Sequence, residues 1–263
     1  MRVYLSTFLM RLKLETQYRA AAIGGVICQM FFGLILIYLY RTIQMPTQTA
    51  EVIAATATYV WFQQACFRML VSNDMELNAI ILKGDIVYQL VRPVDQYWYW
   101  FSRALAQKVM GCALRAAPML VFALLLPKGI GLSLPHSFAH LLLCLVSLSL
   151  GFIVVAALEA ISSGLSIRTL DNRGITAALG LVRIFLAGNI IPLNMFPDSW
   201  QRFNAFNPFA QIIDTPIRLY TGEFAFSDVP AQLLLQLAWT VALILMGRYI
   251  WSRNLKRVIV QGG

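Results

Sequence analysis

The residues best spaced to bind a metal are His136 and His140, because an HxxxH spacing places both imidazoles on one face of a helix. Two ligands do not make a site, and no neighbouring carboxylate completes one. The four cysteines lie inside apolar stretches without CxxC spacing, so we interpret them as packing residues. We therefore predict neither a metal ion nor a cofactor bound by this chain.

Support for catalysis is equally weak. A hydrolase within a membrane needs a nucleophile beside a base, or two carboxylates placed together, and no such pair is evident. The run Asp171-Asn172-Arg173 is typical of a tight turn that starts a helix. The phosphate-binding pattern GxxxxGK[ST] does not occur in the sequence, so we do not expect a nucleotide to bind in that way.

Among the charged residues inside apolar stretches, we single out Arg115, Glu159 and Arg183. An arginine near the centre of a bilayer costs roughly 2.5–3.5 kcal/mol on insertion scales, so each should face protein or water. Glu159 could pair with either arginine. Two interpretations stay open: a polar feature of a translocation path, or a structural ion pair with side chains that reach toward the cytoplasmic interface.

Composition explains why these charges are so costly. Of the 263 residues, 59% are hydrophobic and 13% are charged, against about a quarter charged in a soluble domain. This excludes a soluble enzyme, a secreted disulfide scaffold and a disordered regulator. The net charge of +9 would suggest nucleic acid in a soluble protein, but here the basic residues flank apolar stretches. The expected partner is a lipid bilayer, with no nucleic acid.

The predicted fold is an all-α integral membrane protein of a single domain, residues 1–263. Six segments approach the roughly 20 apolar residues that a spanning helix needs. They are Ala20–Tyr40, Val52–Ser72, Leu105–Leu126, Ser137–Ser163, Thr176–Leu193 and Ala231–Trp251. With both termini cytoplasmic, the outer side holds only four of the 21 basic residues: Arg41, Lys128, Arg202 and Arg218. This bias predicts a multi-pass protein of the cell membrane with its termini inside.

Residues 1–19 carry apolar residues on one helical stripe, including Leu5, Phe8 and Leu9, among scattered charges. The pattern predicts an amphipathic helix lying in the cytoplasmic interface. The alternative is a cytoplasmic extension of the first spanning helix.

The inner connection, residues 73–101, predicts a short helix, a turn at Gly84, and a second helix that begins beside Asp85. Ile86 and Leu90 lie on one face of this second helix, and Arg92-Pro93 ends it. Such a helix across the cytoplasmic face is typical of a docking element for a soluble partner. The alternative is that it packs only against the inner helix ends of its own chain.

The outer connection, residues 192–230, repeats aromatic residues every three or four positions and is broken by prolines. The sequence predicts an outer hairpin that either re-enters the outer leaflet or lies flat as an interfacial cap. Its aromatic residues are candidates for an outer gate: Phe196, Trp200, Phe203 and Phe206.

Together these features resemble the permease subunit of type 2 ABC exporters. The resemblance extends over essentially the whole chain. The matching residues are Gly84, Asp85 and the run Gln89-Leu90-Val91-Arg92-Pro93-Val94. Val87 departs from the pattern, because the family carries a second acidic residue there. The stretch Ile161–Leu165 is superficially similar to an ABC signature, but it ends a span and is interpreted as small-residue packing.

The resemblance implies a half-transporter without chemistry of its own. Two permeases, identical or related, would enclose the path, and separate ATPase subunits would hold ATP and Mg²⁺. A single copy would leave Arg115 or Arg183 facing lipid, which is a further reason to expect pairing. Residues Gly84, Asp85, Ile86, Leu90, Arg92 and Pro93 would form the coupling helix. The alternatives are a membrane enzyme acting on lipid and a membrane scaffold or channel component.

Overall fold

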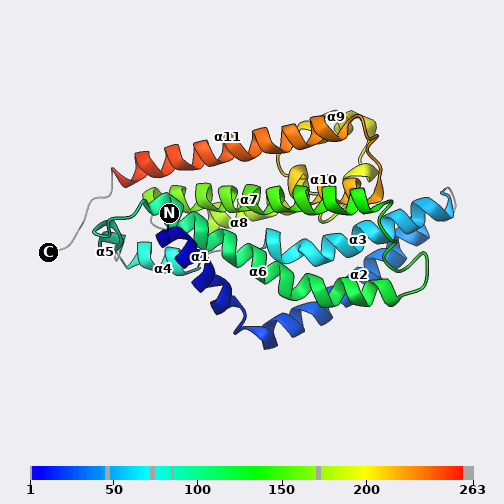
Figure 1. Ribbon diagram of the computed structural model, residues 1–263, viewed down its shortest axis with the longest axis horizontal. Coiled ribbons are helices and arrows are strands. Elements are labelled where there is room, and N and C mark those ends of the chain that lie inside the picture. The colour runs from blue at the N-terminus through cyan, green and yellow to red at the C-terminus, as the bar shows by residue number, and fades with distance from the viewer. Residues whose placement is uncertain (1, 45–47, 72–74, 84–85, 170–172, 257–263) are drawn as a thin grey trace.

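The computed structural model describes residues 2–44, 48–71, 75–83, 86–169 and 173–256. Within these ranges all regular structure is helical, and the helices form an elongated bundle (Figure 1). In chain order the elements are α1 (Arg2–Glu15), α2 (Arg19–Gln44), α3 (Ala50–Leu70), α4 (Met75–Leu82), α5 (Ile86–Leu90), α6 (Gln96–Leu125), α7 (Phe138–Thr169), α8 (Arg173–Leu186), the 3-10 helix η1 (Leu193–Met195), α9 (Asp198–Phe206), α10 (Ala210–Thr221) and α11 (Val229–Leu255).

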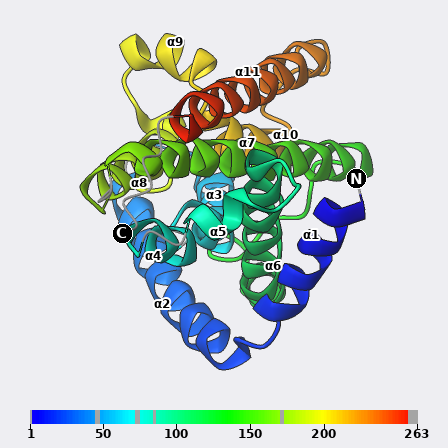
Figure 2. The same cartoon turned by 90° about the vertical axis from the view of Figure 1, so that its left-hand side faces the viewer.

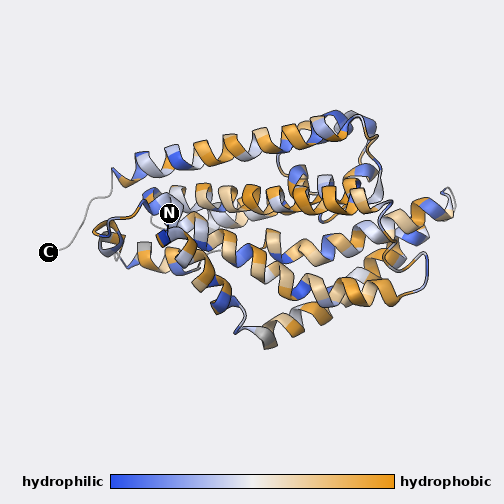
Figure 3. Ribbon diagram, viewed as in Figure 1, coloured by the Kyte–Doolittle hydropathy of each residue, from blue (hydrophilic) through white to orange (hydrophobic). Residues whose placement is uncertain are grey.

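Four helices are long and apolar enough to cross a membrane: Ala20–Ile43, Gln96–Leu125, Phe138–Arg168 and Val229–Leu255. They coincide with the first, third, fourth and sixth predicted spans. Hydrophobic residues run along much of α7 and the middle of α11 (Figure 3). The chain is therefore a multi-pass, all-helical membrane protein.

The other two predicted spans differ from these four. The second forms α3, a helix of 21 residues whose buried face includes Gln63 and Gln64, so its composition is too polar for a lipid-facing span. The fifth, predicted to reach Leu193, ends as a helix at Leu186. The cause is a turn at Gly188, where φ is 75°. The 14 residues of α8 extend about 21 Å, less than the roughly 30 Å of a bilayer core. The count of six spans stays a prediction.

Helix α7 is the centre of the bundle and packs against α11, α10 and α6. Polar bonds join it to α11 along its length: the Trp251 indole donates to the Ala160 carbonyl at 2.6 Å, and Gln236 accepts from the Ser147 hydroxyl at 2.9 Å. Gly151 lets α10 approach, because a Cβ there would lie 2.7 Å from the backbone oxygen of Ile212. Such close contacts hold the outer and inner elements on one rigid helix.

The N-terminal helix α1 is separate from α2, and the two meet at an angle beside α6 (Figure 2). The helical conformation is interrupted between Glu15 and Arg19, so α1 is not a straight extension of the first span. Leu5 and Leu9 are exposed on α1, whereas Thr7 and Glu15 are buried. The exposed leucines are what a helix in the membrane interface would present to lipid.

Candidate functional site

The inner segment between α3 and α6 carries the predicted coupling residues. Gly84 and Asp85 lie outside the described residues. Ile86 is 9% exposed and belongs to the same buried core cluster as Leu77, so it anchors α5. Its side chain is not accessible to a partner protein. Leu90 is exposed, as are Arg92 and Pro93.

Two residues that the sequence interpretation did not single out extend this exposed surface. Tyr88 is 74% exposed and Val91 is 79% exposed, although both are large and apolar in body. The signal was present in the sequence, because Val91 lies within the matching run and both flank Leu90. Tyr88, Leu90 and Val91 form what we call the α5 tip.

Helix α5 is fastened to the start of α6. The Gln96 side chain donates to the Gln89 carbonyl at 2.6 Å. Asp95 caps α6 by accepting from the Trp98 backbone N–H at 3.2 Å, as expected at a helix N-terminus. The end of α5 is therefore in direct contact with the first turn of a candidate spanning helix.

Helix α4 is fastened as well, through Glu76. Its carboxylate pairs with Arg11 of α1 at 3.4 Å and with Arg103 of α6. The Arg103 guanidinium also lies over the Trp100 ring, 4.9 Å from the ring centroid. Three elements far apart in sequence thus meet at one carboxylate.

Deeper in the bundle, the structure brings together a charge cluster formed by Lys108 of α6, Glu159 of α7 and Arg183 of α8. The Lys108 Nζ lies 2.7 Å from Glu159 Oε2, and an Arg183 terminal nitrogen lies 3.5 Å from the same oxygen. The exposed fractions of the three residues are 1%, 6% and 7%. Of the two pairings that the sequence left open for Glu159, the one with Arg183 forms. The sequence interpretation missed Lys108, whose only signal was a charge inside a predicted span.

Arg183 is thus shielded within a single chain, so of the two arginines it gives no reason to expect a second copy. Arg115 does not join the cluster. It lies instead against Gly25 of α2, in a separate pocket that also contains Arg68. The two arginines that looked equivalent in sequence therefore have different surroundings.

A cavity of about 310 Å³ lies beside the charge cluster, between α7, α8, α11 and the start of α10. Glu159 and Arg183 line it together with mainly apolar residues such as Leu179, Phe209, Trp239 and Met246. This combination of an apolar chamber with one charged wall suits an amphipathic molecule.

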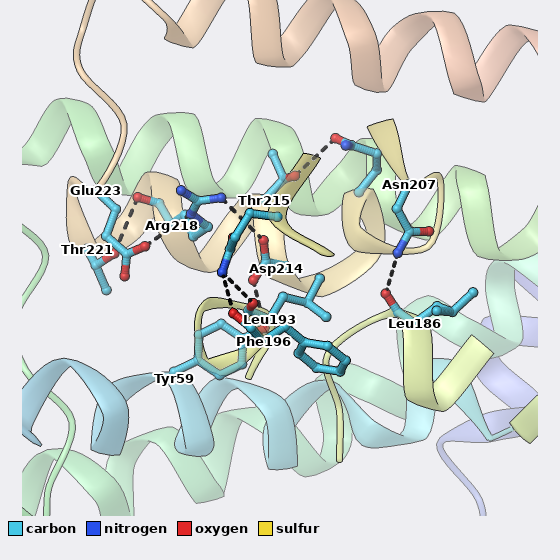
Figure 4. Close-up of polar contacts among 12 residues, drawn as sticks. Tyr59, Leu186, Leu193, Phe196, Asn207, Asp214, Thr215, Arg218, Thr221 and Glu223 are labelled. Atoms are coloured by element: carbon cyan, nitrogen blue, oxygen red, sulfur yellow. Dashed lines mark hydrogen bonds and ion pairs between the residues drawn. The ribbon is translucent and has the colours of Figure 1, made fainter. Parts of the chain in front are cut away.

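The outer segment divides into a buried helix and an exposed one. Most of α10 is buried against α7 and α3, and its Asp214 accepts a hydrogen bond from the Tyr59 hydroxyl at 2.8 Å (Figure 4). Arg218 lies 3.8 Å from Asp214 and donates to Glu223 at 3.0 Å. Burial raises the pKa of Asp214 to about 6, although Arg218 opposes the shift.

The candidate gate residues gather around η1 and α9. Phe196, Trp200 and Phe203 stack in succession, with ring centroids 5.9 Å apart at both steps. Phe196 also meets Phe185 of α8 at 5.6 Å. Phe206 does not belong to this stack and is 69% exposed. A side-chain hydrogen bond holds the hairpin to α8, since the Asn207 carboxamide nitrogen donates to the Leu186 carbonyl at 2.7 Å (Figure 4).

The histidine pair lies at the N-terminal end of α7. The rings of His136 and His140 are 4.8 Å apart, and His140 Nδ1 is 2.7 Å from the Ser137 hydroxyl. Among the described residues no three potential metal ligands gather in one place. At the start of α7 the Ser137 hydroxyl accepts from the His140 backbone N–H at 3.4 Å, and the His140 ring contacts Phe226.

Comparison with known proteins gives the family. No curated protein matches the sequence. A family model described as "ABC-2 family transporter protein" matches residues 25–262, which is nearly the whole chain and includes every candidate spanning helix beyond the first residues of α2. The helices from α3 to α11 and most of α2 lie within this match, whereas α1 precedes it. The chain belongs to the ABC-2 family of transporter proteins, as a membrane component of an ABC transporter.

Proposed function

We propose that this chain is a single permease unit that forms half of the path of an ABC exporter and is driven by a separate ATPase subunit through α5. ATP and Mg²⁺ would be held on that partner, and a second permease would complete the path. In this proposal both termini face the cytoplasm of a cell whose plasma membrane the helices cross.

The α5 tip is the observation that carries the proposal. Large apolar groups exposed together on a short helix usually mark a binding surface. Tyr88 and Val91 are more than 70% exposed, whereas Ile86 is buried and holds the helix in place. An apolar socket on the ATPase would cover the tip, and the exposed Arg92 could pair with a carboxylate at its rim.

The linkage from this tip to the candidate spans supports coupling. The Gln96–Gln89 hydrogen bond joins α5 to α6, and Glu76 joins α4 to α1 and α6. Because ATP-driven motion has to move helices, a docking helix needs rigid attachment to them. A free loop would absorb the displacement.

The outer aromatic stack supports a gate as a second part of the proposal. The stack connects α8 to α9 through Phe185 and Phe196, so movement of α8 would shift α9. The inner cavity beside Arg183 would receive the substrate before the outer end opens.

The test is Val91→Asp, produced together with the ATPase encoded for this transporter. The matched control is Leu134→Asp, because Leu134 is equally exposed at 79% but lies at the opposite, outer end of the bundle. We expect Val91→Asp to insert and fold normally but to lose at least tenfold in ATPase affinity, since a charge buried in an apolar socket costs more than 1.4 kcal/mol. Normal copurification and normal substrate-stimulated ATP hydrolysis in Val91→Asp would refute docking at α5.

A further inference from the structure

A second polar pocket, distinct from the charge cluster, lies between α1, α2, α3 and α6. Its volume is about 260 Å³, and it is open on one side. Figure 2 shows α1 and α2 meeting at an angle next to α6, at the edge of the bundle. Its polar lining consists of Arg11, Glu15, Arg68, Gln107 and Arg115.

The pocket carries positive charge that the described residues do not balance. Arg11 is already paired, at 3.3 Å with Glu15 and at 3.4 Å with Glu76. Arg68 donates only to the Val71 carbonyl, and Arg115 has neither an ion pair nor a hydrogen bond among the described residues. Two guanidinium groups without a carboxylate are unfavourable at the edge of a bilayer, so an anion from outside the chain would stabilise them.

The helices are shaped around these two arginines. A Cβ on Gly25 would lie 2.6 Å from the Arg115 Cζ, and a Cβ on Gly111 would lie 3.4 Å from the Arg68 Cγ. Gly25 therefore leaves the space that the Arg115 guanidinium occupies. Side chains on a helix tilt toward its N-terminus. Arg115 therefore points back along α6 toward Gly111, the position that Arg68 of α3 contacts. Both cations thus reach one pocket.

Lipid is the source of anion that fits the surroundings. The remaining lining includes Tyr18, Ala22 and Leu114, and α2 next to it exposes Ile23 and Ile27, each at 62%. A soluble anion would leave this apolar surface uncovered, whereas the acyl chain of a lipid would pack against it. Basic pockets between helices on the cytoplasmic side are suited to anionic headgroups. We propose that Arg68 and Arg115 bind the phosphate of an anionic phospholipid from the leaflet that contains α1.

Guanidinium groups can hold a phosphate with two parallel hydrogen bonds, so each arginine should matter. The experiment measures binding of dioleoylphosphatidylglycerol to the purified full-length chain by native mass spectrometry, with dioleoylphosphatidylcholine as the neutral lipid. We expect Arg68→Gln/Arg115→Gln to weaken phosphatidylglycerol binding about a hundredfold, or about tenfold for each arginine. Binding of phosphatidylcholine should not change.

The matched control is Arg248→Gln/Arg253→Gln, which removes two exposed arginines from the inner end of α11. We expect its affinity for phosphatidylglycerol to stay within about twofold of the wild type, because remote surface charges act weakly. Equal affinity in the wild type and Arg68→Gln/Arg115→Gln would overturn the proposal. An equal loss in both double variants would overturn it as well, since it would indicate only general charge attraction.

Gly25→Ala keeps every charge and tests the geometry if the double variant folds poorly. Its new methyl group would displace the Arg115 guanidinium and should weaken phosphatidylglycerol binding several-fold, while Gly24→Ala, with nothing within 4 Å of the added Cβ, should not. Inorganic phosphate separates the two sources of anion. Phosphate that competes fully at the same concentration as phosphatidylglycerol would show a soluble-anion site and refute the lipid assignment.

Discussion

Replacing Glu159 by Gln should be among the most damaging single changes in this protein. The substitution keeps the shape of the side chain but removes the negative charge of Glu159, which both Lys108 and Arg183 contact. Both cations are more than 90% buried. They would remain close together in a medium that screens them poorly, so repulsion adds to the lost attraction.

The magnitude follows from the count of charges. Removing one partner of a buried ion pair costs about 3–5 kcal/mol. Lys108→Met is the informative comparison, because it leaves one cation and one carboxylate, and the methionine fills a similar volume. We expect that change to cost about 1 kcal/mol or less. For a protein of this size 1 kcal/mol corresponds to about 2–4 °C in Tm, so Glu159→Gln should lower Tm by about 6–20 °C.

Thermal unfolding of the purified variants in one detergent, followed by tryptophan fluorescence, measures the difference. Glu159→Asp serves as the charge-preserving control and should fall between the wild type and Glu159→Gln. A Lys108→Met variant that is less stable than Glu159→Gln would refute the reasoning. So would a Glu159→Gln variant that melts within about 2 °C of the wild type.

Three further outcomes are expected. Gly151→Ala should cost about 1–3 kcal/mol in a thermal melt, because its Cβ would meet the backbone of α10 at 2.7 Å, whereas Gly24→Ala should be neutral or slightly stabilising. Since the pKa of Asp214 rises on folding from 3.8 to about 6, stability should fall as pH increases through that window and level off above it; Asp214→Asn should remove this slope in melts at several pH values. Phe203→Ala/Phe206→Ala should leave Tm nearly unchanged, because both rings are more than half exposed, but should alter transport in reconstituted vesicles; unchanged transport would contradict the gate.

The long apolar helices could be predicted from the sequence because their few polar residues do not outweigh a long apolar stretch. Each of α2, α6, α7 and α11 contains a predominantly apolar stretch of at least 18 residues. Inside a bilayer the backbone N–H and C=O groups must bond to each other, which a helix achieves within one segment. The fifth span was placed too far along the chain for the same reason. Hydropathy continues past Leu186, whereas the turn at Gly188 depends on contacts from α3.

The surroundings of the buried charges were harder to predict. A sequence shows that a charge inside an apolar stretch is costly to desolvate, but it does not show which residues pair with that charge. Arg115 and Arg183 looked alike on this measure. Folding places Arg183 beside Glu159 and Lys108, and it places Arg115 in the pocket with Arg68. The difference depends on which helix faces meet, and those faces are set by the packing of glycines and large side chains across helices.

The inner segment shows the same division at a smaller scale. Residue order alone indicated a short helix ended by Arg92-Pro93, because the residue before proline avoids helical geometry. Ile86 and Leu90, four residues apart, were expected to share a docking face. In the fold Ile86 enters the core and Leu90 stays exposed beside Tyr88 and Val91. Local sequence determines that a helix forms, since its signals lie within a few residues, but only tertiary packing decides which side is buried, because burial depends on what the rest of the chain brings to it.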